Sequence, residues 1–160
     1  TADRGVAFDH RVRPDARAEL QRQVDASLAA GAVLLLGGRP GDGPCEYPAT
    51  SLDHVVPGVP AYSEELFGPV ASIIRAADDN DAIRIANDTA FGLAASIWTE
   101  DKAKGEALAR KIQGGAVFIN ALVRSDVRLP FGGTKTSGFG RELAEHGIHE
   151  FMNIKTVYVD

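Results

Sequence analysis

Two adjacent carboxylates, Glu64 and Glu65, precede a Gly-Pro turn in the stretch PAYSEELFGPVASIIRA at residues 60–76. Pro69 fixes its own φ angle and restricts the residue before it, so an acid close to this turn is held in one direction. A held carboxylate is a good acceptor for the two hydroxyl groups of a ribose, and Phe67 offers a flat apolar surface to a ring. The alternative is a solvated pair of acids at the start of a turn. The residues alone leave both interpretations open.

Other residue types that could do chemistry lack the neighbours they would need. Cys45 lies in the turn-rich stretch GDGPCEYP, where no sequence feature lowers a thiol pKa, so we interpret it as a bystander. Residues 132–142 hold several glycines without the spacing of a phosphate loop, which predicts close packing against another backbone or passage near a ligand. The four histidines show no metal-ligand spacing, so no metal site is predicted: His10, His54, His146 and His149.

Composition narrows the class of protein. The chain has 160 residues, 44% of them hydrophobic and 24% charged, which is typical of one globular domain. The net charge of -5 comes without a basic stripe, so no nucleic-acid partner is expected. The longest apolar run, AVLLL, is too short to cross a bilayer, and no membrane partner is expected. A single cysteine and no secretory signal pattern predict a cytoplasmic protein.

Hydrophobic periodicity predicts helices and strands in alternation. Leu20, Val24 and Leu28 recur every four residues, which predicts a helix over about 14–30 with Gly31 as its C-cap. Acidic residues before 80–88, and Thr99 or Asp101 before 102–113, are suitable helix N-caps. A short helix is predicted near 140–146, and an extended piece near 46–53. The predicted strands are residues 32–38, 70–76, 93–99, 116–120 and 154–159.

This alternation favours an α/β fold, a layered αβα unit with a mostly parallel sheet covered by helices on both faces. The runs VLLL and VFI lack polar alternation, as strands buried on both faces should. The last predicted strand, IKTVYV, alternates between apolar and polar residues. That pattern suits an edge strand, or a strand that pairs with another chain.

Several motifs together resemble one family. EELFGPV, AAGAVLLLGG, AIRIANDTAFGLAASIWTED, GGAVFIN and LPFGGTKTSGFGRELAEHGIHEFMNIKTV follow one another as the corresponding motifs do in NAD(P)-dependent aldehyde dehydrogenases. The resemblance covers nearly the whole chain and is closest to the succinate-semialdehyde dehydrogenase branch. It implies NAD or NADP as the cofactor and a small aldehyde as the substrate.

The resemblance implies a role for each matching position. Glu65 would hydrogen-bond the nicotinamide ribose, with Glu64 as its structural neighbour, and Phe67 would pack at the nicotinamide. Phe131 would line the aldehyde pocket. In the loop 120–129, Ser125 would bind a substrate carboxylate.

Positive charge near that carboxylate would come from Arg124 or Arg128, for which a solvated surface role is the alternative.

The chain departs from the family pattern at the reacting groups. The nucleophilic cysteine of the GQ-x-C motif and the general-base glutamate are not matched, and Cys45 corresponds to a different segment. We therefore expect residues 1–152 to form the C-terminal part of the catalytic domain and residues 153–160 an oligomerisation strand, without the nucleotide-binding domain.

The resemblance implies that the intact enzyme oxidises an aldehyde, expected to be succinate semialdehyde, through a cysteine thiohemiacetal. The chain alone is expected to be inactive. The alternative is a free-standing module that only self-associates.

Overall fold

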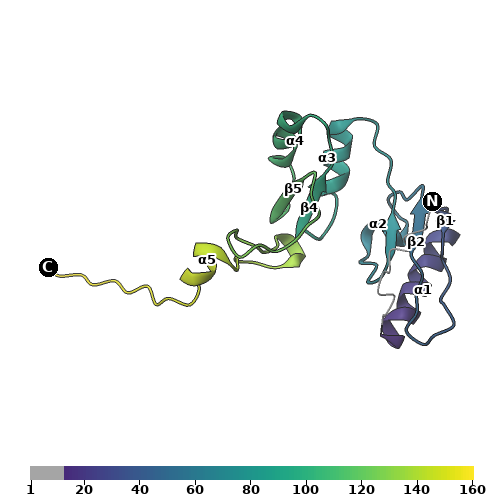
Figure 1. Ribbon diagram of the computed structural model, residues 1–160, viewed down its shortest axis with the longest axis horizontal. Helices are drawn as coiled ribbons and strands as arrows, with labels where there is room; N and C mark the ends of the chain where they lie inside the picture. Colours follow the sequence, from purple (N-terminus) through teal and green to yellow (C-terminus); the bar gives the residue numbers. More distant parts are fainter. Residues whose placement is uncertain (1–12) are drawn as a thin grey trace, which may run out of the picture. The chain divides into compact units, whose positions relative to one another are not determined.

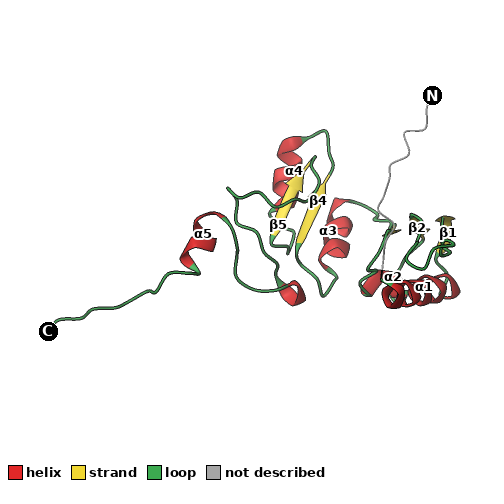
Figure 2. Ribbon diagram, turned by 60° about the horizontal axis from the view of Figure 1, so that its bottom comes forward, coloured by secondary structure: helices red, strands yellow, loops and turns green. Residues whose placement is uncertain are grey.

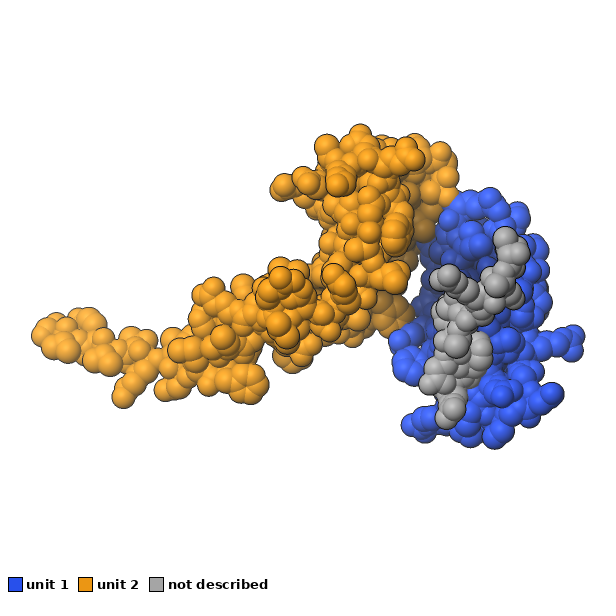
Figure 3. Space-filling view, in the orientation of Figure 1, with its two compact units in different colours: residues 1–75 blue, residues 76–160 orange. Residues whose placement is uncertain are grey.

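The computed structural model describes residues 13–160, so His10 lies outside the described residues. The chain forms two compact units, Thr1–Arg75 and Ala76–Asp160 (Figure 3). Composition predicts a single domain, and nothing in the sequence signals a division at Arg75. The two units are described separately below.

The first unit contains one long helix and a three-stranded sheet (Figure 1). Its sheet has the order β1-β2-β3, in which β1 is antiparallel to β2, and β2 is parallel to β3. The helix predicted over 14–30 is confirmed, and Gly31 follows its end with a positive φ angle of 104°. The elements are α1 (Pro14–Ala29), β1 (Val33–Leu36), β2 (Thr50–Asp53), α2 (Pro60–Ser63) and β3 (Val70–Ser72).

The core of this unit lies between α1 and β2. Leu20 and Val24 of α1 are buried together with Leu52 of β2 and with Tyr47, the largest of the fully buried side chains. Gly68 of the EELFGPV motif lies so close to Leu20 that a Cβ atom there would overlap the leucine side chain. The motif is therefore packed directly against the core.

The prediction that VLLL is buried on both faces is wrong for this chain. All four residues of β1 are exposed, from 39% for Leu34 to 61% for Leu36. The physical reason is position, because β1 is an edge strand and the core gathers around its neighbour β2. VFI, in the second unit, is half-buried and not fully buried.

The second unit contains two parallel strands, β4 and β5, with α3 and α4 beside them (Figure 2). Asp78 and Asp101 cap the two helices by accepting hydrogen bonds from the backbone N–H groups of Asp81 and Lys104, at 2.9 and 3.0 Å. Of the two N-caps considered for α4, Asp101 is the one observed. The elements are α3 (Asp79–Asn87), β4 (Ala94–Ile97), α4 (Lys102–Ala109), β5 (Ala116–Ile119), a 3-10 turn (Lys135–Ser137) and α5 (Ala144–His149).

The glycine-rich stretch 132–142 packs against other backbone, as its composition predicts. A Cβ atom on Gly115, at the start of β5, would overlap the carbonyl oxygen of Gly132. The two Gly-Gly pairs of GGAVFIN and LPFGG therefore meet inside this unit.

The final stretch, residues 153–160, forms no strand within this chain, and its side chains are exposed. Ile154 is 92% exposed and Tyr158 82%. Within residues 13–160 the predicted strand has no pairing partner, and a β-strand exists only when its backbone groups are paired. Among the described residues, no helix has the length and apolar character needed to span a membrane.

The α/β class is confirmed, although two small sheets, one mixed and one parallel, stand in place of one mostly parallel sheet.

Candidate functional site

The two acids of the EELFGPV motif lie in the connection between α2 and β3. Glu64 ends α2, and its backbone N–H donates to the carbonyl of Pro60 at 2.9 Å. Beyond the acids, the carbonyl of Pro69 accepts from the backbone N–H of Thr50 in β2 at 2.9 Å. Both ends of the segment are thus tied to regular elements, which keeps the acids between them in a defined place.

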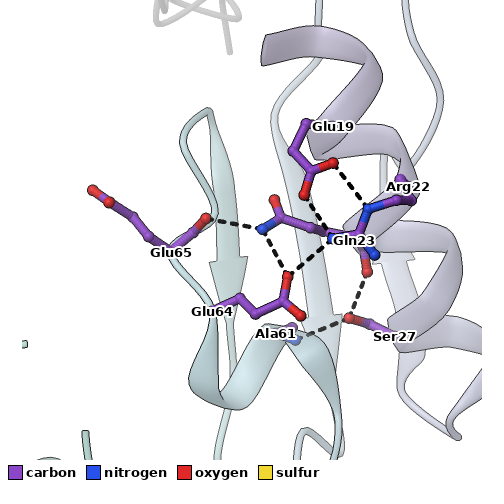
Figure 4. A network of polar contacts seen from close by, with 7 residues as sticks. All are labelled: Glu19, Arg22, Gln23, Ser27, Ala61, Glu64 and Glu65. Atoms are coloured by element: carbon purple, nitrogen blue, oxygen red, sulfur yellow. Dashed lines mark hydrogen bonds and ion pairs between the residues drawn. The ribbon is translucent and has the colours of Figure 1, made fainter. Parts of the chain in front are cut away.

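The two carboxylates have different surroundings (Figure 4). The Glu64 carboxylate accepts hydrogen bonds from Gln23 Nε2 at 3.0 Å and from Arg22 Nη2 at 3.2 Å. Glu65 is exposed, and within residues 13–160 no side chain or backbone group donates to its carboxylate. Its backbone carbonyl is held instead, by Gln23 Nε2 at 3.1 Å. The carboxylate of one acid is therefore held by α1, although the Glu64 side chain is still 40% exposed, and the other acid presents its oxygens outward from a fixed backbone.

Phe67 lies two residues beyond Glu65, and 71% of it is exposed. An aromatic ring of this size is normally buried, because it removes a large apolar area from water. The ring and the Glu65 carboxylate are thus both exposed on one short segment, which offers an apolar group and a hydrogen-bond acceptor. That combination is suited to a ligand that carries both a ring and hydroxyl groups.

In the second unit, the polar substrate residues predicted from the family resemblance lie in the loop 120–129, after β5. Arg124 and Ser125 are exposed. Arg128 is engaged by Asp126, with 2.6 Å between Nη2 and Oδ2, and this hydrogen bond holds the pKa of Asp126 well below its usual range. Arg124 lies outside this ion pair, although its charge also lowers the pKa of Asp126.

Phe131 follows this loop and pairs with Glu142 through two backbone hydrogen bonds of 2.9 and 2.8 Å. It lines a cavity of about 1000 Å³ within the second unit, together with Val127 and Phe139. Ser125 and Arg124 are not among the residues that line this cavity. The structure therefore places Phe131 at a cavity and the two polar residues on the exposed part of the same loop.

The remaining candidates have no such setting. Cys45 is half-buried and forms no disulfide. Within residues 13–160, no group of three or more histidine, cysteine or carboxylate side chains could hold a metal ion.

One residue of the site was missed by the sequence reasoning. Gln23 binds both Glu64 and Glu65, and it is only 6% exposed. The signal was a polar residue beside Val24 on the buried face of α1. A buried amide needs hydrogen-bond partners, and these had to come from another segment.

Comparison with known proteins assigns the chain to a family. The sequence profile of the Aldehyde dehydrogenase family matches residues 3–157. The chain belongs to the aldehyde dehydrogenase family. Among curated relatives of this dehydrogenase chain, "Succinate-semialdehyde dehydrogenase [NADP(+)] 1" of Mycobacterium ulcerans is 52% identical over 89% of the chain and 31% of the relative. "Succinate semialdehyde dehydrogenase [NAD(P)+] Sad" of Escherichia coli is 48% identical over 99% of the chain and 34% of the relative.

Solved structures of the same family agree with the fold. The succinic semialdehyde dehydrogenase of Streptococcus pyogenes, in complex with NADP+, matches with a TM-score of 0.86 and 37% identity, over 91% of this chain and 32% of the other. An aldehyde dehydrogenase of Mycobacterium tuberculosis, complexed with NAD+, matches with a TM-score of 0.81 and 35% identity, over 86% and 29%. The chain thus spans about a third of the length of the relatives it matches.

Proposed function

We propose that this chain forms the part of an NAD(P)-dependent aldehyde dehydrogenase that holds the nicotinamide ribose and lines one side of the aldehyde site. The observation that carries the proposal is the difference between the two acids. Gln23 and Arg22 engage Glu64, whereas Glu65 presents an exposed carboxylate from a fixed backbone. A ribose offers two neighbouring hydroxyl donors, and a carboxylate has two oxygens to accept them.

The residues near Glu65 fit the rest of such a cofactor. The exposed ring of Phe67 would provide an apolar contact for the nicotinamide ring. Gln23 holds the backbone before this ring, at Glu65, and Pro69 restricts the backbone after it. When bound, NAD(P)+ accepts the hydride released by the substrate. The task of this chain is to bind and orient the ribose through Glu65 and the ring through Phe67.

For the substrate, we infer an aldehyde that also carries a carboxylate, and succinate semialdehyde in particular. Two of the relatives described above are named for that substrate. Ser125 would donate its hydroxyl to the carboxylate, Arg124 would supply positive charge, and Phe131 would form an apolar wall. All three lie in one continuous stretch after β5, and Ser125 and Arg124 are exposed.

The chain alone is expected to have no turnover. The proposed reaction proceeds through a cysteine thiohemiacetal, which requires a nucleophilic thiolate beside a general base. The sequence contains a single cysteine, Cys45, half-buried in a turn and outside any catalytic motif. In the proposed enzyme, the nucleophile and the base would lie outside these 160 residues.

We also propose a homo-oligomer assembled through residues 153–160. Exposed apolar side chains recur along this stretch, including Ile154 at 92%, Val157 at 76% and Val159 at 84%. An extended segment of this kind can add to the edge of another sheet. The same exposure favours the second candidate, a free-standing module that only self-associates. The cytoplasmic location expected from the single cysteine stays a prediction.

The test of cofactor binding is the Glu65→Gln variant of the complete dehydrogenase that contains this chain. The dissociation constant for NAD(P)+ should rise about tenfold or more, because one of the two carboxylate oxygens that accept from the ribose hydroxyls is replaced by an amide group that donates. Glu100→Gln, at another exposed glutamate, is the matched control and should bind like the wild type. Unchanged affinity in Glu65→Gln would contradict the proposal, as would aldehyde-dependent NAD(P)H formation by the 160 residues alone.

The substrate assignment has its own test, the Ser125→Ala variant. Its KM for succinate semialdehyde should rise about fivefold or more, because a hydrogen bond to a charged group is lost. Its KM for butanal, which has a similar length and no carboxylate, should stay within about twofold of the wild type. An equal rise for both aldehydes would show that Ser125 does not recognise the carboxylate.

A further inference from the structure

Beside the apolar Leu20 and Val24, the buried face of α1 carries two polar residues, Gln23 and Ser27. They are 6% and 0% exposed. Residues four apart on a helix lie one above the other on the same face. Both side chains face the segment that carries the two acids (Figure 4).

The Gln23 amide makes two contacts at once. Its Nε2 atom donates to the Glu64 carboxylate at 3.0 Å and to the backbone carbonyl of Glu65 at 3.1 Å. Both hydrogens of the amide group have an acceptor. A single side chain therefore fixes the carboxylate of one acid and the backbone of the next.

Ser27 holds the beginning of the same segment. Its hydroxyl donates to the carbonyl of Gln23 at 2.7 Å and accepts from the backbone N–H of Ala61 at 3.0 Å. The segment from Ala61 to Glu65 is thus attached to α1 at both ends. Its placement follows that of the helix.

We propose that Gln23 is a positioning residue for cofactor binding, which aims the Glu65 carboxylate by holding the Glu65 carbonyl and the Glu64 carboxylate. The inference rests on the proposed role of Glu65 as the ribose acceptor. A carboxylate can accept hydrogen bonds from two hydroxyl groups of one ring only when both of its oxygens point toward them. A shift of the backbone changes the direction in which these oxygens point. Gln23 itself does not touch the ribose; it acts through Glu65.

Three variants of the complete dehydrogenase separate this role from general stability. Gln23→Leu removes the amide, and Gln23→Glu keeps its size and shape while it replaces the donor with an acceptor. Gln21→Leu is the matched control on the same helix. Gln21 donates to Asp25 Oδ1 at 2.7 Å and to the carbonyl of Gly38 at 3.2 Å, and it accepts from the buried Tyr47 hydroxyl at 3.1 Å, so it shares the core with Gln23 but contacts neither of the two glutamates.

We expect the dissociation constant for NAD(P)+, measured without aldehyde by calorimetry, to rise about tenfold in both Gln23 variants. The KM for the cofactor should rise with it, and the KM for the aldehyde should stay within about twofold. Gln21→Leu should remain within about twofold of the wild type for all three constants. Hydrogen exchange at residues 61–66 should be faster in Gln23→Glu and unchanged in Gln21→Leu, a readout that needs no activity.

The outcomes distinguish the inference from the proposed function. If Glu65→Gln weakens cofactor binding and both Gln23 variants bind normally, the inference is wrong and the proposed function stands. If Gln21→Leu weakens binding as much as Gln23→Leu does, the effect comes from helix stability and the inference is also wrong. If Glu65→Gln itself binds normally, the proposed function fails, and the inference fails with it.

Discussion

The two compact units are built differently. In the part of the chain that the structure describes, every fully buried apolar side chain belongs to the first unit, from Leu20 to Ala61. The only fully buried residues in the second unit are glycines, namely Gly92, Gly105 and Gly133. The first unit is thus held mainly by apolar side chains, and the second by the close approach of backbone and by hydrogen bonds.

This difference bears on how each unit presents its functional residues. Burial of a leucine or valine side chain contributes about 1.5–3 kcal/mol to the stability of the fold. The core of the first unit therefore stabilises the segment that carries Glu65. The second unit has no comparable core, and its loop 120–129 is tied by polar contacts such as that between Asp126 and Arg128. The proposed cofactor contact therefore lies on the better packed unit, and the proposed substrate contacts on the more open one.

The largest effect is expected in the core of the first unit. Leu52 is 0% exposed, so Leu52→Ala should lower the free energy of unfolding by about 2–5 kcal/mol. Leu35→Ala, at a residue of the same sheet that is 56% exposed, should cost well under half of that. Urea unfolding of both variants measures the difference. Equal losses would show that β1 is packed as tightly as β2.

A smaller effect is expected where backbone meets backbone in the second unit. Gly115→Ala would place a Cβ atom on the carbonyl of Gly132, which cannot move independently of its chain, and should destabilise the protein by about 1–3 kcal/mol. Gly114→Ala is the matched control, because its Cβ would meet ordinary contacts of 3.6 Å or more. Thermal unfolding of the two variants tests this; a tolerated Gly115→Ala would remove the contrast between the units.

Much of the fold could be predicted from local signals in the sequence. The four-residue spacing of Leu20, Val24 and Leu28 placed α1, and acidic caps placed the start of α3 and α4. The density of glycine at 132–142 indicated close backbone packing, which Gly132 provides. These features depend on residues close together in the chain, and a sequence shows such relations directly.

Features that depend on distant segments could not be predicted. The exposure of β1 follows from its place at the edge of a sheet, which pairing determines and apolar composition does not. The contacts of Gln23 join residues 41 and 42 positions apart. Residues 154–159 have the pattern of a strand, but a strand needs a partner, and no other part of the described chain is paired with them. The roles of Glu65, Phe67 and the substrate residues rest on family resemblance and remain predictions.

The smallest effects concern one aspartate in each unit. In the first unit, the backbone N–H of His54 and then the side chain of Arg75 lower the pKa of Asp53, whose side chain is 6% exposed. In the second unit, the side chain of Arg128, itself 82% exposed, lowers the pKa of Asp126. A carboxyl group with a lowered pKa in the folded state stabilises the fold above its unfolded pKa of about 4. That stabilisation is lost only as the pH falls through the folded pKa, so neither group should destabilise the protein between pH 8 and pH 5.

Salt should separate the two aspartates, because the contact that lowers the pKa most differs between them. For Asp126 it is the side chain of Arg128, ahead of a backbone hydrogen bond, and for Asp53 it is the backbone N–H of His54, ahead of an arginine. The exposed ion pair of Asp126 is screened when the Debye length shortens to about 3 Å in 1 M salt, whereas the short backbone hydrogen bond to Asp53 is not. Carbon-13 NMR titration of the carboxyl groups should therefore show that 1 M NaCl raises the pKa of Asp126 more than that of Asp53. Equal changes would mean that Arg75 and not the His54 amide controls Asp53. The better packed unit would then depend on exposed charge as much as the open one does.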